Sequence, residues 1–258
     1  MNGAVDLNAD LGEGFGAWRM GDDAALLEVV TSANVACGYH AGDAGTMART
    51  CALAAERAVA IGAHVAYRDL AGFGRRAIDV PAAQVRDEVL HQIGGLAAFA
   101  AAAGSRVAYV KPHGALYHRA CADGEVAAAV VDAAVAASGM AGAGPMAVLS
   151  LPGSALGAAA RAAGLVEVAE GYLDRGYTPV GALVPRGAPG DVLHDPDEIA
   201  ARAVDLAAGR PVAAVGGGHV RLAVRSLCTH GDEPAAVEAA RRSRAALEAA
   251  GVTVAAFA

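Results

Sequence analysis

The chain has 258 residues and a formal net charge of −7, with 55% hydrophobic and 18% charged residues. This apolar content suffices for a full core, and the acidic balance argues against a nucleic-acid surface. The Ala-rich runs, such as Leu96–Ala103, are too short to cross a membrane, and the polar N-terminus lacks a signal-peptide pattern. We therefore expect a cytoplasmic protein that binds neither nucleic acid nor membranes.

Short apolar runs alternate with longer Ala-rich helical patterns. In chain order, the expected elements are strand Ala4–Leu7, helix Asp22–Val30, strand Ser32–Ala36, helix Gly45–Ala60, strand Ile61–Ala63, helix Pro81–Ala103, strand Val107–Val110, helix Glu125–Ser138, strand Ala147–Leu151, helix Ser154–Ala163, strand Val166–Ala169, helix Pro196–Ala208, strand Leu222–Cys228 and helix Pro234–Ala250. This alternation predicts an α/β fold with a parallel sheet and helices outside it. Seven or eight units suit a barrel or a distorted barrel, with an open doubly wound sheet as the alternative. No linker interrupts the chain, so we expect a single domain over residues 1–258.

The unusual polar residues follow the expected strands. They are Asn8, Asp10 and Glu13, then Asn34, Cys37, His40 and Asp43, then His64, then Lys111 and His113, then Glu170, Asp174 and Arg175, and finally His230 and Asp232. In a barrel, the carboxyl-terminal ends of the strands converge on one face, where active sites are built. We therefore expect these side chains to share one site.

Lys111 is the only lysine of the chain, beside nineteen arginines. A lysine ammonium is a compact charge whose pKa shifts readily, whereas a guanidinium is always charged. The only lysine lies two residues before His113, and this position predicts that the segment belongs to a catalytic site. We predict catalytic roles for Asp10, Glu13, His40, Asp43, His64, Lys111, His113 and His230. We predict substrate contacts for Asn8, Asn34, Arg75, Arg76, Asp174 and Arg175.

Several of these residues also have a purely structural interpretation. Asp43 suits the N-cap of the helix that follows it, and Asp232 suits the same role at the last helix. His64 suits a core histidine bonded to the backbone. The adjacent Arg75 and Arg76 suit either an anion clamp or a salt-bridged surface loop.

The sequence limits the kinds of chemistry. It contains no Cys-x-x-Cys pair, no Gly-x-x-x-x-Gly-Lys-[Ser/Thr] phosphate loop and no Gly-x-Ser-x-Gly elbow. Water is therefore the expected nucleophile, with Asp10 or a histidine as general base and with Lys111 and His113 stabilising an oxyanion or protonating a leaving nitrogen. A divalent metal held by Asp10, His64 and His113 is a further prediction.

Ordered motifs over nearly the whole chain resemble one known family. They are Asp6-Leu7-Asn8-Ala9-Asp10-Leu11-Gly12-Glu13-Gly14-Phe15-Gly16, Ser32–Asp43, Gly62-Ala63-His64, Gly72-Phe73-Gly74-Arg75-Arg76, Val110-Lys111-Pro112-His113-Gly114, Asp174-Arg175-Gly176-Tyr177 and Cys228-Thr229-His230-Gly231-Asp232. On these motifs the chain resembles the LamB/YcsF family of 5-oxoprolinase A subunits.

The resemblance implies a (β/α) barrel-like fold related to carbohydrate deacetylases and glycoside hydrolases. It also implies ATP-dependent hydrolysis of 5-oxo-L-proline, a lactam, to L-glutamate, together with partner subunits B and C. ATP would then act through the complex. Two alternatives stay open at this point: a metal-dependent deacetylase or amidohydrolase that acts alone, and a non-catalytic lactam-binding subunit.

Overall fold

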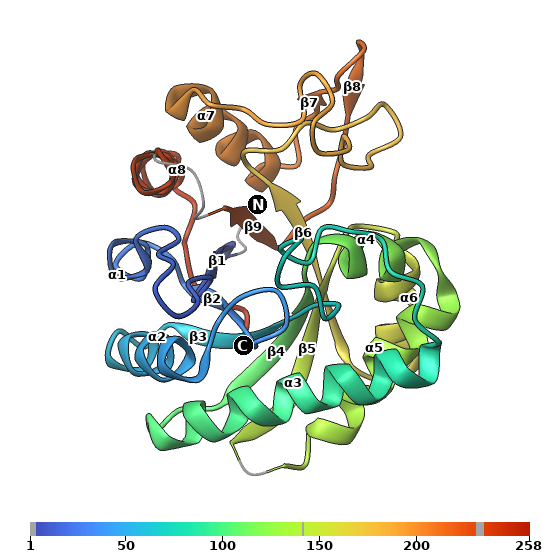
Figure 1. Ribbon diagram of the computed structural model, residues 1–258. Coiled ribbons are helices and arrows are strands. Elements are labelled where there is room, and N and C mark those ends of the chain that lie inside the picture. The colour runs from blue at the N-terminus through green and yellow to red at the C-terminus, as the bar shows by residue number, and fades with distance from the viewer. Residues whose placement is uncertain (1–3, 141, 231–234) are drawn as a thin grey trace.

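The computed structural model describes residues 4–140, 142–230 and 235–258. Seven parallel strands close into a barrel in the order β1-β2-β3-β4-β5-β6-β9, and the helices surround it (Figure 1). The predicted α/β barrel is confirmed, in its seven-stranded form, and the open doubly wound sheet is excluded. Within the described residues, no helix has the length and apolar character needed to cross a membrane.

The elements have the following bounds. The barrel strands are β1 (Asp6–Leu11), β2 (Ser32–Ala36), β3 (Ala60–Val65), β4 (Val107–Pro112), β5 (Ala143–Ser150), β6 (Val166–Tyr172) and β9 (Ser226–Thr229). The helices are α1 (Asp23–Leu26), α2 (Ala44–Glu56), α3 (Ala82–Ala102), α4 (Gly114–Ala122), α5 (Gly124–Ala137), α6 (Ala155–Ala162), α7 (Pro196–Ala207) and α8 (Ala236–Ala249). A separate antiparallel pair, β7 (Val212–Ala213) and β8 (His219–Val220), lies next to α7.

The first strand differs from its prediction in a way that matters for the site. It runs over Asp6–Leu11 rather than Ala4–Leu7, so Asn8 and Asp10 lie within the strand and not after it. Side chains alternate between the two faces of a strand. Leu7, Ala9 and Leu11 therefore join the apolar core under the helices, while the polar residues between them face the barrel interior. The same correction applies to His64 in β3 and Lys111 in β4.

Two further predictions are corrected near the end of the chain and after β4. The expected strand Leu222–Cys228 starts only at Ser226, and the short β7–β8 pair precedes it. Helix α4 was not predicted, because it follows β4 with only His113 between them and has no side-chain N-cap bond. Asp232 and the predicted start of the last helix at Pro234 lie outside the described residues.

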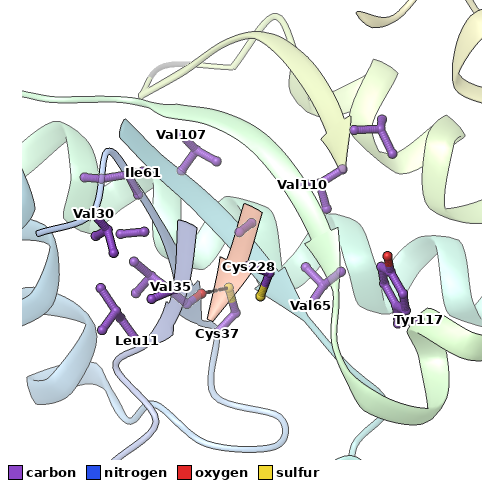
Figure 2. Packing of buried hydrophobic residues seen from close by; sticks show 14 of the residues in the cluster. Leu11, Val30, Val35, Cys37, Ile61, Val65, Val107, Val110, Tyr117 and Cys228 are labelled. Carbon is purple, nitrogen blue, oxygen red and sulfur yellow. Dashed lines mark hydrogen bonds between the residues drawn. The ribbon is translucent and has the colours of Figure 1, made fainter. Parts of the chain in front are cut away.

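The main apolar core lies between the barrel and the helices. Figure 2 shows Leu11, Val35 and Ile61 packed close to one another on neighbouring strands. Cys37 is buried in this cluster as a free thiol, whereas the free thiol of Cys228 lies against Lys111 inside the barrel. The barrel interior is filled differently, because polar side chains occupy much of it.

Gly62 in β3 makes room inside the barrel for an aromatic ring. A Cβ atom at this position would lie 2.0 Å from Cε2 of Tyr109, far inside contact distance. Without that atom the Tyr109 ring fits fully buried against β3, and its hydroxyl donates a 2.7 Å hydrogen bond to Asn34 Oδ1. Glycine at position 62 therefore lets one large side chain fill the barrel below the site.

Candidate active site

A cavity of about 300 Å³ opens at the carboxyl-terminal end of the barrel. Its wall contains half of the predicted site residues, namely Asp10, His64, Arg75, Lys111, His113, Arg175 and His230. The others, Asn8, Glu13, Asn34, His40, Asp43, Arg76 and Asp174, are not part of this wall. The residues of the wall come from distant stretches of the chain, as expected for strand ends that converge in a barrel.

The Lys111 ammonium lies buried at the floor of the cavity between two carboxylates. Its Nζ is 3.3 Å from Asp10 Oδ1 and 3.0 Å from Glu170 Oε2. Nζ also lies 3.0 Å from Cys228 Sγ, to which it donates. Burial alone would lower the pKa of Lys111, but attraction to the carboxylates of Asp10 and Glu170 outweighs it and raises the pKa well above the ordinary value. Lys111 is therefore positively charged at neutral pH.

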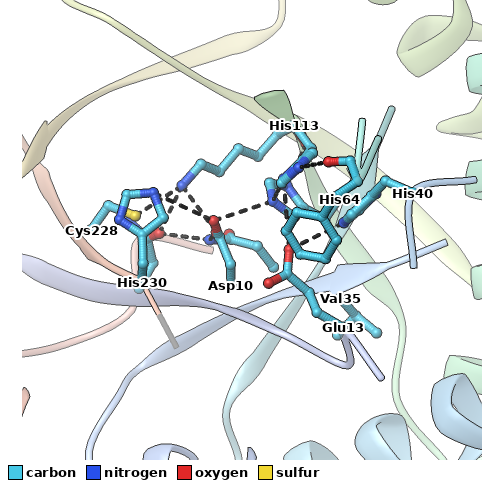
Figure 3. Close-up of polar contacts among 12 residues, drawn as sticks. Asp10, Glu13, Val35, His40, His64, His113, Cys228 and His230 are labelled. Carbon is cyan, nitrogen blue, oxygen red and sulfur yellow. Dashed lines mark hydrogen bonds and ion pairs between the residues drawn. The ribbon is translucent and has the colours of Figure 1, made fainter. Parts of the chain in front are cut away.

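Asp10 is the central acid of the site, with histidines on both sides (Figure 3). Its Oδ2 lies 3.3 Å from His64 Nε2 and 3.9 Å from His230 Nε2. Burial would raise the pKa of Asp10, but attraction to His64 and Lys111 outweighs it and holds the pKa well below the ordinary value. Asp10 is therefore an ionised carboxylate at neutral pH.

Asn8 and Asn34 lie beneath the cavity and hold Asp10 in place. Asn34 Nδ2 donates to Asp10 Oδ1 at 2.8 Å and to Asn8 Oδ1 at 2.7 Å. Asn8 Nδ2 in turn donates to Ser226 Oγ at 2.7 Å, and Ser226 donates to Asp6. Both asparagines are completely buried. They thus position the acid and the ammonium from below instead of lining the cavity, where substrate contacts were predicted.

His64 and His113 have fixed orientations because each ring bonds a backbone carbonyl. His64 Nδ1 lies 3.0 Å from Lys111 O, and His113 Nε2 lies 2.9 Å from Phe73 O. A carbonyl oxygen only accepts hydrogen bonds, so these two nitrogens carry the protons. Their other nitrogens, His64 Nε2 and His113 Nδ1, are 3.0 Å apart. Burial, followed by the neighbouring His40 and His64, lowers the pKa of His113 well below its ordinary value.

Glu13 and His40 form a buried pair beside these rings. His40 Nε2 lies 3.1 Å from Glu13 Oε1, and Glu13 Oε1 lies 3.6 Å from His113 Nδ1. The His40 ring is completely buried, and burial lowers its pKa to about 3, so it is neutral. Glu13, His40, His64 and His113 each offer a ligand atom within 4.8 Å of the others, an arrangement that suits a divalent metal ion. Asp10, which was predicted as a ligand, is not a member of this group.

His230 and Asp174 form a pair on the opposite side of Asp10. His230 Nδ1 lies 2.9 Å from Asp174 Oδ2, and the His230 backbone N–H donates to the same oxygen at 2.9 Å. Burial would lower the pKa of His230, but attraction to Asp174 outweighs it and raises the pKa above the ordinary value. Asp174 therefore supports His230, whose Nε2 points toward Asp10.

The predicted arginines have different surroundings. Arg75 lies in the cavity wall, whereas Arg76 is ion-paired with Asp69 and lies outside that wall. Arg175 also belongs to the wall, but its guanidinium donates to the carbonyls of Asp191 at 2.9 Å and Val184 at 2.6 Å. The Arg75 guanidinium lies over the Phe73 ring, 4.9 Å from its centroid, and the contacts of Arg76 and Arg175 stabilise loops.

Asp43 takes the structural role that was its alternative interpretation. Its side chain is the N-cap of α2 and accepts from Thr46 N at 2.8 Å and from Gly16 N at 2.5 Å. These bonds to two backbone amides lower the pKa of Asp43. The side chain therefore holds the loop after β1 against α2, and this loop carries Glu13.

Glu170, which was expected in the shared site without an assigned role, pairs with Lys111. Several other residues of the site were not predicted. Tyr172 packs its ring near Lys111 Nζ, 5.1 Å away, and stacks on His230. Tyr117, His118 and Arg186 also belong to the wall. No local pattern marks Arg186, which lies in a long loop after β6.

Comparisons with known proteins show the family to which this chain belongs. The LamB/YcsF family model matches residues 5–258. The A subunit of a 5-oxoprolinase from Streptomyces griseus is 59% identical over 254 residues, which cover 98% of this chain and 100% of that protein, and the one from Paracidovorax citrulli is 53% identical over 98% of this chain and 99% of that protein. The crystal structure of the lactam utilization protein from Thermus thermophilus superposes with a TM-score of 0.90 at 44% identity, over 98% of this chain and 100% of that chain. This chain therefore belongs to the LamB/YcsF family.

Proposed function

We propose that this chain hydrolyses the cyclic amide 5-oxo-L-proline to L-glutamate as the A subunit of an ATP-dependent 5-oxoprolinase. The observation that carries the proposal is the buried Asp10–Lys111 ion pair at the floor of a cavity that is also lined by histidines and arginines. The names of the similar proteins, the A subunit of 5-oxoprolinase and the lactam utilization protein, support the same substrate class.

The residues at the cavity floor can supply each proton and charge that opening of an amide requires. The ionised Asp10 takes a proton from water, and the water oxygen attacks the lactam carbonyl carbon. The Lys111 ammonium stabilises the negative charge that develops on the carbonyl oxygen. His230, whose protonated form Asp174 favours by raising its pKa, gives a proton to the ring nitrogen as the carbon–nitrogen bond breaks. The products are a carboxylate and an amine, as in glutamate.

The wall of the cavity suits the carboxylate of the proposed substrate. Arg75 and Arg186 both line it, and guanidinium groups bind carboxylates with geometric specificity. The same groups suit a phosphoryl oxygen if the substrate arrives in activated form. A 5-oxoproline molecule whose carboxylate lies against these arginines can direct its amide toward Asp10 and Lys111.

ATP and partner subunits belong to the proposal for chemical reasons. A five-membered lactam resists hydrolysis, and transfer of the γ-phosphoryl group of ATP to its amide oxygen, with ADP leaving, would make the carbonyl carbon more electrophilic. Attack of water and cleavage of the carbon–nitrogen bond would then leave an acyl phosphate, whose hydrolysis gives the carboxylate and inorganic phosphate. The chain contains no phosphate loop of the Gly-x-x-x-x-Gly-Lys-[Ser/Thr] type, which supports a division of the work with subunits B and C in the cytoplasm.

Glutamate release from 5-oxoproline tests the proposal directly. The assay compares the purified chain alone, the chain with subunits B and C, and subunits B and C alone, each with and without ATP. We expect substantial turnover only from the complete set with ATP. Full turnover by the isolated chain would contradict the division of labour, and full turnover by subunits B and C alone would contradict a catalytic role for this chain.

A second candidate function is a metal-dependent amide hydrolase that acts alone. The group of Glu13, His40, His64 and His113 favours it, because these side chains suit a divalent ion. This candidate predicts that the isolated chain hydrolyses simple amides without ATP and releases a carboxylate, such as acetate, together with ammonia or an amine. Absence of such activity in the metal-loaded chain would exclude it.

A further inference from the structure

Two imidazole nitrogens with unshared electron pairs face each other in the site. Because His64 Nδ1 and His113 Nε2 donate to backbone carbonyls, the lone pairs of neutral rings lie on His64 Nε2 and His113 Nδ1, only 3.0 Å apart. His64 Nε2 also lies 3.3 Å from the carboxylate oxygen Asp10 Oδ2. When both rings are neutral, two lone pairs and a carboxylate oxygen at these distances repel one another, so either a proton or a metal cation has to lie between them.

The relative orientation of the two rings allows one ion to bind both. The His64 and His113 ring planes cross at 88°, so a single point can lie in both planes and meet both lone pairs. Zinc binds imidazole nitrogen at about 2.0–2.1 Å, and tetrahedral geometry then separates two ligand atoms by roughly 3.3 Å. The observed 3.0 Å between the two nitrogens is close to that separation.

Glu13 completes a set of three ligands, and His40 supports it. Glu13 Oε1 lies 3.6 Å from His113 Nδ1, again near the separation expected for two ligands of one ion. His40 is stacked on His113 with ring centroids 3.9 Å apart and planes only 6° from parallel, so no single ion can lie in both planes. His40 Nε2 instead contacts Glu13 Oε1 at 3.1 Å and orients the carboxylate.

We propose that Glu13, His64 and His113 bind one divalent cation of the zinc class, with the fourth coordination position open toward the cavity. Asp10 Oδ1 contacts Lys111 and Asn34, and Asp10 is not a member of the group whose ligand atoms all lie within 4.8 Å of one another. Asp10 is therefore assigned to a position beside the ion as the base and not as a ligand. Three protein ligands with one open position are typical of catalytic zinc sites. Such an ion would polarise a carbonyl or acidify a bound water. The inference rests on the donor geometry alone and holds whether or not the substrate is 5-oxoproline.

Metal binding by the isolated chain tests this inference separately from any assay of turnover. The full chain, stripped with a chelator, is titrated with Zn²⁺ by calorimetry and with Co²⁺ by visible absorption. We expect one equivalent of either ion to bind, with a Co²⁺ spectrum of low coordination number. No saturable binding at one equivalent would overturn the proposal, and a proton shared by His64 and His113 would then account for the short contact.

Variants identify the ligands. We expect Glu13→Gln, His64→Gln and His113→Gln to weaken binding by more than about 100-fold, since even partners that only orient ligands contribute about 10–100-fold. The exposed His219→Gln is the matched control and keeps wild-type affinity. Asp10→Asn also keeps one equivalent. Loss of the ion in Asp10→Asn together with retention in Glu13→Gln would overturn the assigned ligand set.

The thermal unfolding midpoint of the wild-type chain, measured with and without Zn²⁺, tests the proposal without depending on whether a variant folds. Binding to the native state raises the thermal midpoint in proportion to the logarithm of free ligand concentration. We expect Zn²⁺ to raise the midpoint of the wild-type chain and of His219→Gln, but not that of a His64→Gln chain whose circular dichroism is native. An equal rise in all three chains would overturn the proposal.

Discussion

Lys111 Nζ lies within 3.3 Å of Asp10 Oδ1 and within 3.0 Å of Glu170 Oε2, so one buried ammonium balances two buried carboxylates. The three residues come from β4, β1 and β6, on different sides of the barrel. Removal of one member of a buried ion pair leaves an uncompensated charge, which costs far more than the loss of a surface pair. We therefore expect this cluster of three charges to contribute to stability as well as to the proposed reaction.

Lys111→Met tests both roles. Loss of the ammonium leaves Asp10 and Glu170 unpaired, so the free energy of unfolding should fall by about 3–5 kcal/mol. In the assembled enzyme kcat should fall by roughly 10²–10³-fold, as for the loss of an oxyanion donor. Urea denaturation and glutamate release measure the two effects. Arg119→Ala, which breaks the surface pair with Asp123, should change neither quantity appreciably.

Wild-type turnover by a folded Lys111→Met chain would refute the catalytic role of the ammonium. It would favour a subunit that binds the lactam without reacting with it.

The pair of His230 and Asp174 makes a prediction about pH. Asp174 raises the pKa of His230, so the protonated form needed as general acid persists to higher pH. Asp174→Asn removes this attraction, and the alkaline limb of the kcat profile should move to lower pH. Asp132→Asn, an exposed change on α5, should leave the profile unmoved. An unchanged alkaline limb in Asp174→Asn would exclude His230 as the acid.

The same pair has a consequence for stability. The folded-state pKa of His230 is raised above its unfolded value, so its contribution to stability is fully present below about pH 6.5. It is lost as pH rises through the folded-state pKa. The stability difference between wild type and Asp174→Asn should therefore be larger at pH 6 than at pH 9, as measured by chemical denaturation. A difference that grows with pH would contradict the assignment.

Gly62→Ala tests the packing beneath the site. The new Cβ would lie 2.0 Å from the Tyr109 ring, so the ring must shift and its hydrogen bond to Asn34 must weaken. Overpacking of this kind costs about 1–3 kcal/mol. The matched change Gly95→Ala in α3 has no atom within 4 Å of the new Cβ and should instead stabilise the chain by up to about 1 kcal/mol. Thermal unfolding of the two variants should shift in opposite directions.

The sequence predicted the barrel well because strand and helix patterns alternate along it. The placement of the polar residues was less accurate. Asn8 and Asp10 were expected beyond the end of the first strand, but they alternate with apolar residues inside β1. Asn34 lies inside β2, whose expected bounds were correct, but it was expected to touch a ligand. The strict alternation of polar and apolar residues in Asp6–Leu11 indicates that the polar side chains face the barrel interior. Both faces of a strand in a closed barrel are buried, but only the outer face packs against helices and has to be apolar.

The site itself was predictable where a residue type is rare or its neighbours are unusual. The single lysine identified the cavity floor, and the histidines after strands identified its sides. Asp43 and Arg76 lie near the site but bond to local partners. A single sequence does not distinguish an aspartate that caps a helix from one that acts as a catalytic acid. Arg186 belongs to the wall only because a long loop folds over the barrel, which no local pattern reports.

Turnover of Asp10→Asn in the assembled enzyme tests the central claim most directly. The substitution keeps the shape of the side chain and removes the charge that lies 3.3 Å from both Lys111 and His64. With subunits B and C and ATP present, we predict that glutamate release from 5-oxoproline falls by about 10²–10⁴-fold, while the exposed Asp79→Asn control and assembly of the complex are unaffected. Wild-type turnover by Asp10→Asn would contradict the claim that the reaction takes place at this cavity floor.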